Sequence, residues 1–368
     1  NRQDAAFQAG WMQDHARRYR MRALMYERIR RGSLSIGDLV AHLDNLLDGD
    51  DDLSRALIPE VWRVNRKEAE GVQHGLERKH FLRTLVLREV CTGMRQSIGL
   101  EPWGRMTVEY SGLAPSLPFM QEWAPEIGCT PEDLASGVAG LLDVYRRSFM
   151  LLDREGHLFS RLWSDGDREI QKGYLPLLRG VPKGLKLRRD SEDEGSRVTQ
   201  WLLAAGGDTQ ARRAARNWGV PRERIDEFLE GLWKLLTEDL ALLAPVTLTW
   251  ANGKALRGCL GIRQIDADRV RLVAHQGLFR CDTCRRVSLR AGPGLACIGY
   301  RCRGTLHASD ENPDDYDLMV LDQQFTMIRA REHSAQIPAD DRERLERLFK
   351  GEQDAVNTLV CTPTLELG

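Results

Sequence analysis

Four of the eight cysteines in this chain have a spacing that suits a metal ion. Two residues separate Cys281 from Cys284, twelve residues follow, and four separate Cys297 from Cys302. Two short-spaced pairs can meet around one ion, and four thiolates favour zinc in a closed, tetrahedral structural site. Because a closed site has no open position for catalysis, the spacing predicts a zinc ribbon that braces the fold.

The cysteine pattern leaves alternatives open. The gap of four residues in the second pair is longer than the commonest zinc spacing, and His307 could replace one cysteine as a ligand. Unpaired core thiols, or a redox or iron–sulfur role, are the other interpretations. Because no secretion signal is recognised in the sequence, the clustering of these four cysteines favours a metal site over disulfide bonds. The remaining cysteines are expected to be small core residues: Cys91, Cys129, Cys259 and Cys361.

The elements before the cysteine cluster are predicted to be mostly helical. Apolar residues at three- and four-residue spacing indicate one long helix over residues 1–31 that ends at Gly32. Further helices are expected up to residue 125, with a short strand over Met106–Tyr110. The Pro-rich stretch over residues 115–125 is the first expected linker. Another helix is predicted over residues 131–163, beginning with a Thr130 cap and Pro131 at its first position.

A helix-turn-helix pattern follows. Apolar residues at helical spacing over 211–218 and 225–236 flank a Gly-Val-Pro turn, which indicates two short helices. Strands are expected over 246–250, 255–262 and 270–275, with a hairpin at Asn252-Gly253, in the order of a winged helix. A helical packing module that never contacts nucleic acid stays possible, because acidic residues of the second helix would repel phosphates: Glu223, Asp226, Glu227 and Glu230.

The last part of the chain alternates strand and helix, as in an α/β domain. A strand is predicted over 325–331 and a buried parallel strand over 356–361. The helix between them, over 340–349, is expected to end before Gly351. Its apolar residues are expected to point inward: Leu345, Leu348 and Phe349.

Charge is balanced over the whole chain and uneven locally. The net charge of −1 indicates no polyanion partner by itself. Basic runs lie over residues 17–31 and 179–189, each followed by acidic residues, and they could form phosphate-facing patches or solvated surfaces. No stretch has the roughly 20 apolar residues of a membrane-spanning helix, so a cytoplasmic protein with no membrane partner is expected.

Both ends of the sequence resemble parts of one known family. The stretches over residues 1–10, 331–336, 342–351 and 360–368 resemble the second RecA-like domain of large superfamily 2 helicases. That family includes helicase-like proteins of bacterial anti-phage systems such as Druantia and DISARM. The resemblance implies an ATP-dependent DNA helicase or translocase that moves on single- or double-stranded DNA without reading its sequence, with other defence-system subunits as further partners. Both ends are expected to be cuts through a longer protein.

The resemblance also implies which residues contact nucleic acid or couple it to ATP: Arg2, Gln3, His333, Ser334, Thr362, Thr364, Glu366 and Gly368. No catalytic residue is expected in this chain. The sequence Gly253-Lys254-Ala255 is not a Walker loop, because the upstream glycine and the hydroxyl residue after the lysine are missing. ATP and Mg²⁺ are therefore expected to bind elsewhere in the full-length protein, whereas the structural Zn²⁺ is expected here.

The predicted fold class is α/β with a mainly α insertion: a second RecA-like domain split by a helical region, a winged helix and a zinc ribbon. The expected divisions are 1–31 and 322–368 for the motor domain, 32–125 and 126–245 for helical regions, and 246–321 for the β-rich region. The first helix should then pack beside the strands over 325–331 and 356–361. The alternative function is a non-enzymatic zinc-ribbon and winged-helix module that binds nucleic acid or protein.

Overall fold

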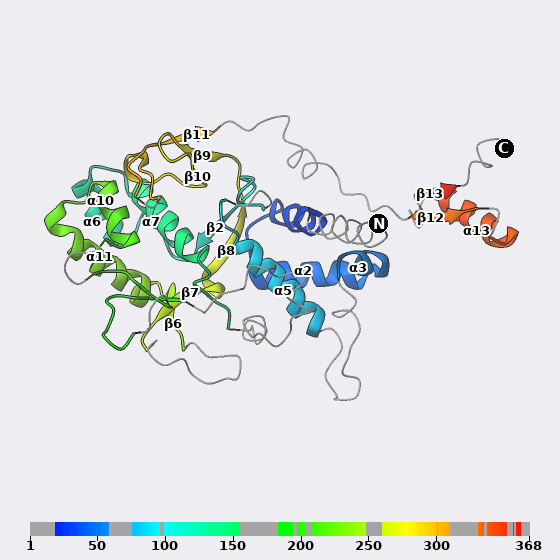
Figure 1. Cartoon of the computed structure of the whole chain (residues 1–368), viewed down its shortest axis with the longest axis horizontal. Coiled ribbons are helices and arrows are strands. Elements are labelled where there is room, and N and C mark those ends of the chain that lie inside the picture. Colours follow the sequence, from blue (N-terminus) through cyan, green and yellow to red (C-terminus); the bar gives the residue numbers. More distant parts are fainter. Residues whose placement is uncertain are drawn as a thin grey trace, which may run out of the picture.

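The computed structural model describes most of the chain between residues 19 and 361. The described residues are 19–58, 76–95, 99–154, 183–193, 197–203, 208–247, 260–299, 301–309, 330–334, 337–351, 356 and 358–361. They form a mixed α/β structure with several small sheets. Figure 1 shows a helical main body, a β-ribbon along one side of it, and a small C-terminal unit at the right.

Helices near the start of the chain have clear sequence signals. The first described helix runs from residue 19 to 29, and Gly32 follows at φ 144°, so the predicted end of this helix is confirmed; residues 1–18 lie outside the described part. Ser35 and Asp38 form a reciprocal capping box at the next helix. The following helices are α2 (Ile36–Asp48), α3 (Asp51–Leu57) and α5 (Leu76–Val90).

The predicted linker over residues 115–125 is wrong, because most of this stretch belongs to helix α6 (Pro118–Ile127). Pro118 occupies the first turn, where its missing N–H costs nothing, and Trp123 is buried. Helix α7 (Pro131–Arg146) begins as predicted, with the Thr130 hydroxyl accepting a hydrogen bond from the Asp133 backbone N–H. It ends earlier than expected, and residues 155–163 lie outside the described part.

The two helices of the predicted helix-turn-helix are confirmed as elements. They are α10 (Gln210–Trp218) and α11 (Ile225–Lys234), joined through the short helix η4 (Arg222–Arg224) and continued by η5 (Leu235–Asp239). Gly219 ends α10 at φ 96°, a left-handed conformation that favours glycine. Phe228 of α11 packs edge-on against Trp218, with ring centroids 6.4 Å apart.

The strands of the described residues form four small sheets. One sheet is antiparallel, with the order β1 (Leu34–Ser35), β8 (Val270–Ala274), β2 (Met106–Tyr110). A second has the order β3 (Leu151–Leu152), β7 (Arg263–Asp266), β4 (Gly184–Lys186), β5 (Val198–Gln200), with β6 (Leu243–Pro245) also paired to β7. A third has the order β10 (Val287–Ser288), β9 (Leu278–Cys281), β11 (Leu306–Ser309), and the fourth pairs β12 (Ala330–His333) with β13 (Thr358–Cys361).

Strands β7 and β8 are joined by η6 (Ala267–Arg269) but enter different sheets. The strand predicted over Met106–Tyr110 has the bounds of β2, and the one predicted over 270–275 matches β8. Of the strand predicted over 255–262, residues 255–259 lie outside the described part, residues 260–262 are not in a strand, and β7 begins at Arg263. Residues 248–259, with the predicted Asn-Gly hairpin, lie outside the described part.

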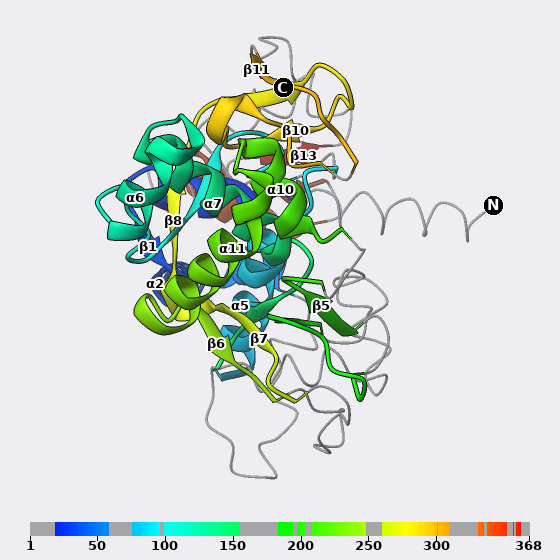
Figure 2. The same cartoon turned by 90° about the vertical axis from the view of Figure 1, so that its left-hand side faces the viewer.

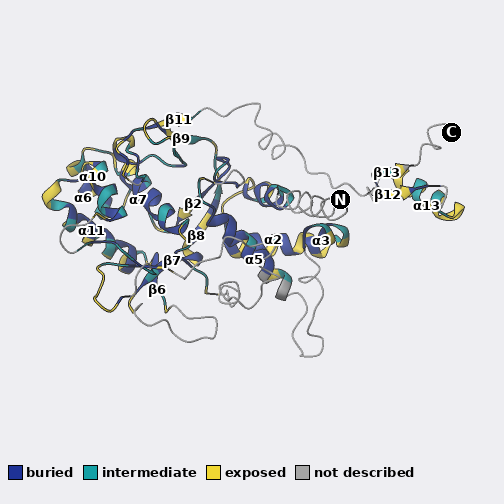
Figure 3. Ribbon diagram, in the orientation of Figure 1, coloured by how far each residue is buried: buried dark blue, intermediate teal, exposed yellow. Residues whose placement is uncertain are grey.

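One large apolar core joins the elements of the main body. It runs from Met21 in the first described helix to Leu272 in β8, and Trp201 is fully buried within it. Figure 3 shows buried residues concentrated on the facing sides of α2, α5, α7, α10 and α11. Figure 2 shows the β-ribbon above α7 and α10. The ribbon is thus seated on the helical body.

In the described residues, the C-terminal unit contains β12, helix α13 (Ala339–Lys350) and β13. The strand predicted to be parallel over 356–361 is confirmed in part: β13 pairs in parallel with β12, with His333 opposite Cys361. The expected inward orientation of the helix residues is wrong for Leu348 and Phe349, which are exposed, as is Val360 of β13 at 59%. Two strands and one helix are too few to cover both faces of this sheet.

The first helix was expected beside these strands. Its described residues pack instead against the main body: Tyr19 stacks on Trp103, and Arg22 pairs with Glu89 of α5 at 2.7 Å. Figure 1 draws β12 and β13 apart from this helix. Among the described residues, packing of the helix against the two strands is therefore not seen.

Candidate metal centre

The four clustered cysteines meet at one point of the segment over residues 278–309, which we call the cysteine ribbon. Their Sγ atoms all lie within 4.8 Å of one another. The Sγ–Sγ distances are 3.6 Å between Cys281 and Cys302 and 3.7 Å between Cys284 and Cys297. These distances are much longer than the ~2.05 Å of a disulfide. A tetrahedral ion with Zn–S bonds of ~2.3 Å would space its sulfurs about 3.8 Å apart, so the four cysteines could hold a metal ion such as zinc.

Backbone N–H groups point at the sulfurs, as a site for negatively charged thiolates requires. Cys281 Sγ accepts from the Cys284 N–H at 3.5 Å, Cys297 Sγ from Gly299 at 3.3 Å, and Cys302 Sγ from Gly304 at 3.3 Å. Burial raises the pKa of Cys297 and Cys302 despite these bonds. A bound cation would reverse that balance, because a coordinating thiol loses its proton outright.

Gly304 fits a position that no other residue could occupy without movement. A Cβ atom there would lie 2.6 Å from Cys281 Sγ and 2.5 Å from both Asp282 Oδ1 and Thr283 Oγ1. The second cysteine turn can therefore approach the first only because residue 304 has no side chain. This glycine lies outside the cysteine spacing, and the sequence interpretation missed it. A glycine two residues after the last cysteine was the available signal.

His307 takes no part in the cluster. Its side chain is exposed, and its Nε2 atom lies 3.6 Å from the Asp282 carboxylate. Within the described residues, the group that could hold a metal contains the four cysteines and not this histidine. Among the lone cysteines, Cys91 is buried and burial raises its pKa to about 12, as expected of an inert core thiol. Cys129 is half-buried, and the side chains of Cys259 and Cys361 lie outside the described part.

The ribbon is fastened to the helices beneath it by polar side chains. Asn217 of α10 donates from Nδ2 to the carbonyls of both Cys297 and Cys302, at 2.9 and 3.0 Å. Gln210 donates to the Ile298 carbonyl at 2.5 Å, and Ser136 of α7 to Ala291 at 2.7 Å. The second cysteine pair is thus held directly by helix α10.

Two glycines allow ribbon and helix to touch. A Cβ at Gly292 of the ribbon would lie 2.8 Å from the Gly137 Cα of α7. A Cβ at Gly137 would lie 2.8 Å from Cδ of Pro293, which begins the short helix η7 (Pro293–Leu295), and 3.1 Å from the Trp218 ring. The ribbon backbone therefore packs directly against helix α7 at this point.

A buried charge network completes the attachment. Its members are Glu101, Asp143, Arg146, Arg147 and Arg290. Asp143 accepts hydrogen bonds from Arg146 Nη2 at 2.9 Å and from Arg290 Nε, in the ribbon, at 3.2 Å. Glu101 accepts from Arg146 at 2.6 Å and from Arg147 at 2.9 Å.

Asp143 carries its charge although it is only 2% exposed. Burial alone would raise its pKa, but the neighbouring arginines, Arg146 first, hold the pKa below its usual range. The Tyr110 hydroxyl of β2 also donates to Asp143, at 2.8 Å. One carboxylate therefore joins the ribbon, α7 and the β1–β8–β2 sheet.

Several described residues of the charged runs seen in the sequence form ion pairs within the fold. Lys186 contacts Asp190 at 2.5 Å, and Arg188 contacts Glu230 at 2.6 Å. In the acidic run, Asp44 pairs with Arg78 at 2.6 Å. These residues are therefore not open phosphate-facing patches.

Only two of the residues expected to contact nucleic acid lie in the described part. His333 is buried at the end of β12, with Nε2 3.0 Å from Glu346 Oε1. Its Nδ1 atom has no partner among the described residues. Ser334 donates to Glu332 at 2.7 Å. The others lie outside the described part: Arg2, Gln3, Thr362, Thr364, Glu366 and Gly368.

Comparisons with known proteins give no family for this chain. Among the described residues, no helix has the length and apolar character needed to cross a membrane. No protein-family model matches the sequence, and neither the curated proteins nor the solved structures contain a match.

Proposed function

We propose that this chain is part of an ATP-dependent DNA helicase or translocase of the superfamily 2 type, acting in bacterial anti-phage defence. In this proposal β12, α13 and β13 belong to the second RecA-like motor domain. The main body and the cysteine ribbon form the accessory region inserted into it, with one structural Zn²⁺ on the four cysteines. ATP and Mg²⁺ bind a further domain of the same protein, because this sequence contains no Walker loop.

The parallel pairing of β12 and β13 is the observation that carries the proposal. Parallel neighbours need a crossover connection, and α13 supplies it, as in the repeating unit of a motor domain. The exposure of Val360, Leu348 and Phe349 supports the same view. A parallel sheet is normally covered on both faces, so further strands and helices are expected to cover these residues.

The register adds a second argument. His333 pairs with Cys361, so the residues that come next in the sequence are Ser334 and Thr362. Ligands of open α/β sheets bind where the carboxyl ends of neighbouring strands meet. We therefore expect the hydroxyl groups of Ser334, Thr362 and Thr364 to grip phosphates of a nucleic-acid backbone at this edge.

The decisive experiment is ATP turnover by the full-length protein with and without single-stranded DNA. Single-stranded DNA should increase the ATP turnover of wild type. The Thr362→Ala variant should lose most of that increase, while its melting temperature should change by less than about 2 °C. Thr199→Ala, in β5 of the main body, is the matched control and should keep full stimulation. Equal turnover in every condition would refute the proposal.

The alternative function is a binding module without enzymatic activity. This alternative is supported by the hydrogen bonds from Asn217 and Gln210, on the first of the two helices of the predicted helix-turn-helix, to the cysteine ribbon. Such a module would bind its partner without any ATP turnover in the full-length protein. The same assay therefore separates the two functions.

A further inference from the structure

A pocket of about 920 Å³ lies between the cysteine ribbon and helix α7. Five arginines line it: Arg95, Arg147, Arg280, Arg285 and Arg286. Asp143 is the one acidic residue among its described lining, and its carboxylate is already occupied by Arg146, Arg290 and Tyr110. The pocket therefore has strong positive charge with no free counter-charge of its own.

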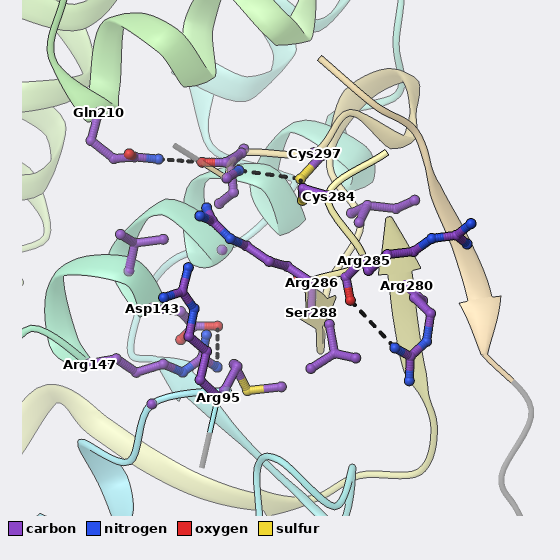
Figure 4. Close-up of a pocket in the computed structure, with 18 residues that line it drawn as sticks. Arg95, Asp143, Arg147, Gln210, Arg280, Cys284, Arg285, Arg286, Ser288 and Cys297 are labelled. Carbon is purple, nitrogen blue, oxygen red and sulfur yellow. Dashed lines mark hydrogen bonds and ion pairs between the residues drawn. The ribbon is translucent and has the colours of Figure 1, made fainter. Parts of the chain in front are cut away.

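Three of these arginines face the same space. Figure 4 shows Arg286 reaching from the ribbon, Arg95 from the loop after α5, and Arg147 from the end of α7. A Cβ at Gly299 would lie 2.9 Å from Arg286 Nη1, so this guanidinium lies over the second cysteine turn. Arg280 is held on the outer side by its bond to the Arg285 carbonyl at 3.4 Å.

The guanidinium groups have donors to spare. Arg147 binds Glu101 through Nε, and its buried Nη2 atom lies 3.6 Å from Asp143 Oδ2 without forming a hydrogen bond among the described residues. For Arg95 and Arg286, the described part of the chain offers no carboxylate partner. A buried donor without an acceptor is costly, so an anion in the pocket would stabilise this arrangement.

We propose that this pocket binds backbone phosphates of a single-stranded nucleic acid. Naming nucleic acid as the ligand rests on the proposed function, whereas the phosphate chemistry rests on the pocket alone. Arginine is suited to phosphate because its planar fork can donate two parallel hydrogen bonds to the oxygens. This site is separate from the strand edge at Ser334 and Thr362.

The charge of the ribbon favours a strand over a small phosphorylated molecule. Residues 278–309 contain six arginines against a single acidic residue, Asp282. Positive charge continues from the pocket over the ribbon surface, where Arg280, Arg285 and Arg303 are exposed. A basic path of this kind follows a nucleic-acid backbone without reading its sequence.

The test measures binding of a fluorescent single-stranded oligonucleotide to the zinc-loaded chain, without ATP, at several salt concentrations. The test variant is Arg95→Gln with Arg286→Gln. The control is Arg55→Gln with Arg222→Gln, two exposed arginines on α3 and η4. Zinc content and circular dichroism of both variants should equal those of wild type, which excludes loss of the metal site as the cause.

We expect the test variant to bind at least about tenfold more weakly and the control to bind like wild type. A plot of log affinity against log salt concentration has a negative slope for such binding. Each lost phosphate contact should reduce the magnitude of this slope by about 0.7. Between 50 and 200 mM salt, the fall in affinity should therefore be about sevenfold smaller for the double variant than for wild type.

Three results would overturn the assignment: no oligonucleotide binding by wild type, equal loss in test and control variants, or pyrophosphate binding that the oligonucleotide cannot displace. The last result would mean a site for a small phosphorylated molecule. The assay contains no ATP, so its failure is distinct from failure of the motor proposal, which depends on DNA-stimulated ATP turnover alone.

Discussion

Replacing Asp143 by asparagine tests how the cysteine ribbon is attached. Asparagine has the same shape but removes the charge that faces Arg146, Arg147 and Arg290. Removing one partner of a buried ion pair typically costs about 3–5 kcal/mol, because the remaining charges stay buried. Asparagine still offers an oxygen to the Tyr110 hydroxyl, so we expect the lower end, about 3 kcal/mol.

The free energy of unfolding can be measured by urea titration, with fluorescence of the buried Trp201 and Trp218 as the signal. A loss of about 3 kcal/mol should also lower the melting temperature by about 4 °C. Glu122→Gln, an exposed carboxylate on α6, is the control and should change stability by less than about 0.5 kcal/mol. A cost below about 1 kcal/mol for Asp143→Asn would refute this role of the network.

The effect of this substitution should depend on pH. The pKa of Asp143 is lowered in the folded protein by its arginine neighbours, whereas an unfolded aspartate has a pKa of about 3.9. The carboxylate therefore contributes stability above about pH 4, and that contribution declines as the pH falls toward the folded pKa. The difference in the free energy of unfolding between wild type and Asp143→Asn should be constant from pH 6 to 8 and should shrink below about pH 4.

The remaining predictions concern the metal site and the seat of the ribbon. Purified protein should contain one zinc, and Cys281→Ser should lose it while the helical body stays folded; less than about half an equivalent in wild type would contradict the site. Gly304→Ala should weaken zinc binding about 10- to 100-fold in a chelator competition, because a Cβ would press on Cys281 Sγ. Gly137→Ala should destabilise the protein by about 1–3 kcal/mol in urea titration, since its Cβ meets Pro293. A Cβ at Gly37 of α2 would make only an ordinary contact, 3.7 Å from Ser35 Oγ, so the matched change Gly37→Ala should be neutral or stabilising.

Sequence patterns predicted local elements well where the signals were local. The cap at Thr130, the end of α10 at Gly219 and the bounds of β2 all follow from short-range chemistry, and the structure has them. The cysteine spacing likewise predicted which four residues meet. The Pro-rich stretch misled, because Pro118 at a first helical turn costs no hydrogen bond. The buried apolar face of α6, with Met120 and Trp123, stabilises the helix although Pro125 lies within it.

Long-range arrangement was beyond the sequence. Nothing in the spacing showed that β7 and β8 would enter different sheets, since pairing partners lie far apart in the chain. The buried charge network was also missed: Glu101, Asp143 and Arg290 resemble surface residues until folding brings them together. The same holds for the pocket between the ribbon and α7, whose five arginines come from three separate segments.

The pocket and the buried charge network share two residues, Asp143 and Arg147, and these connect ligand binding to the attachment of the ribbon. Within the network, three arginines face two carboxylates, so one positive charge is not balanced. Arg147 pairs with Glu101 on one side and lines the pocket on the other. A bound phosphate would balance the surplus charge, so single-stranded DNA should raise the melting temperature of wild type. In Asp143→Asn the surplus grows by one, and the phosphate should then bind more tightly relative to wild type at low salt. Unchanged or weaker binding by that folded variant would show that network and pocket act independently.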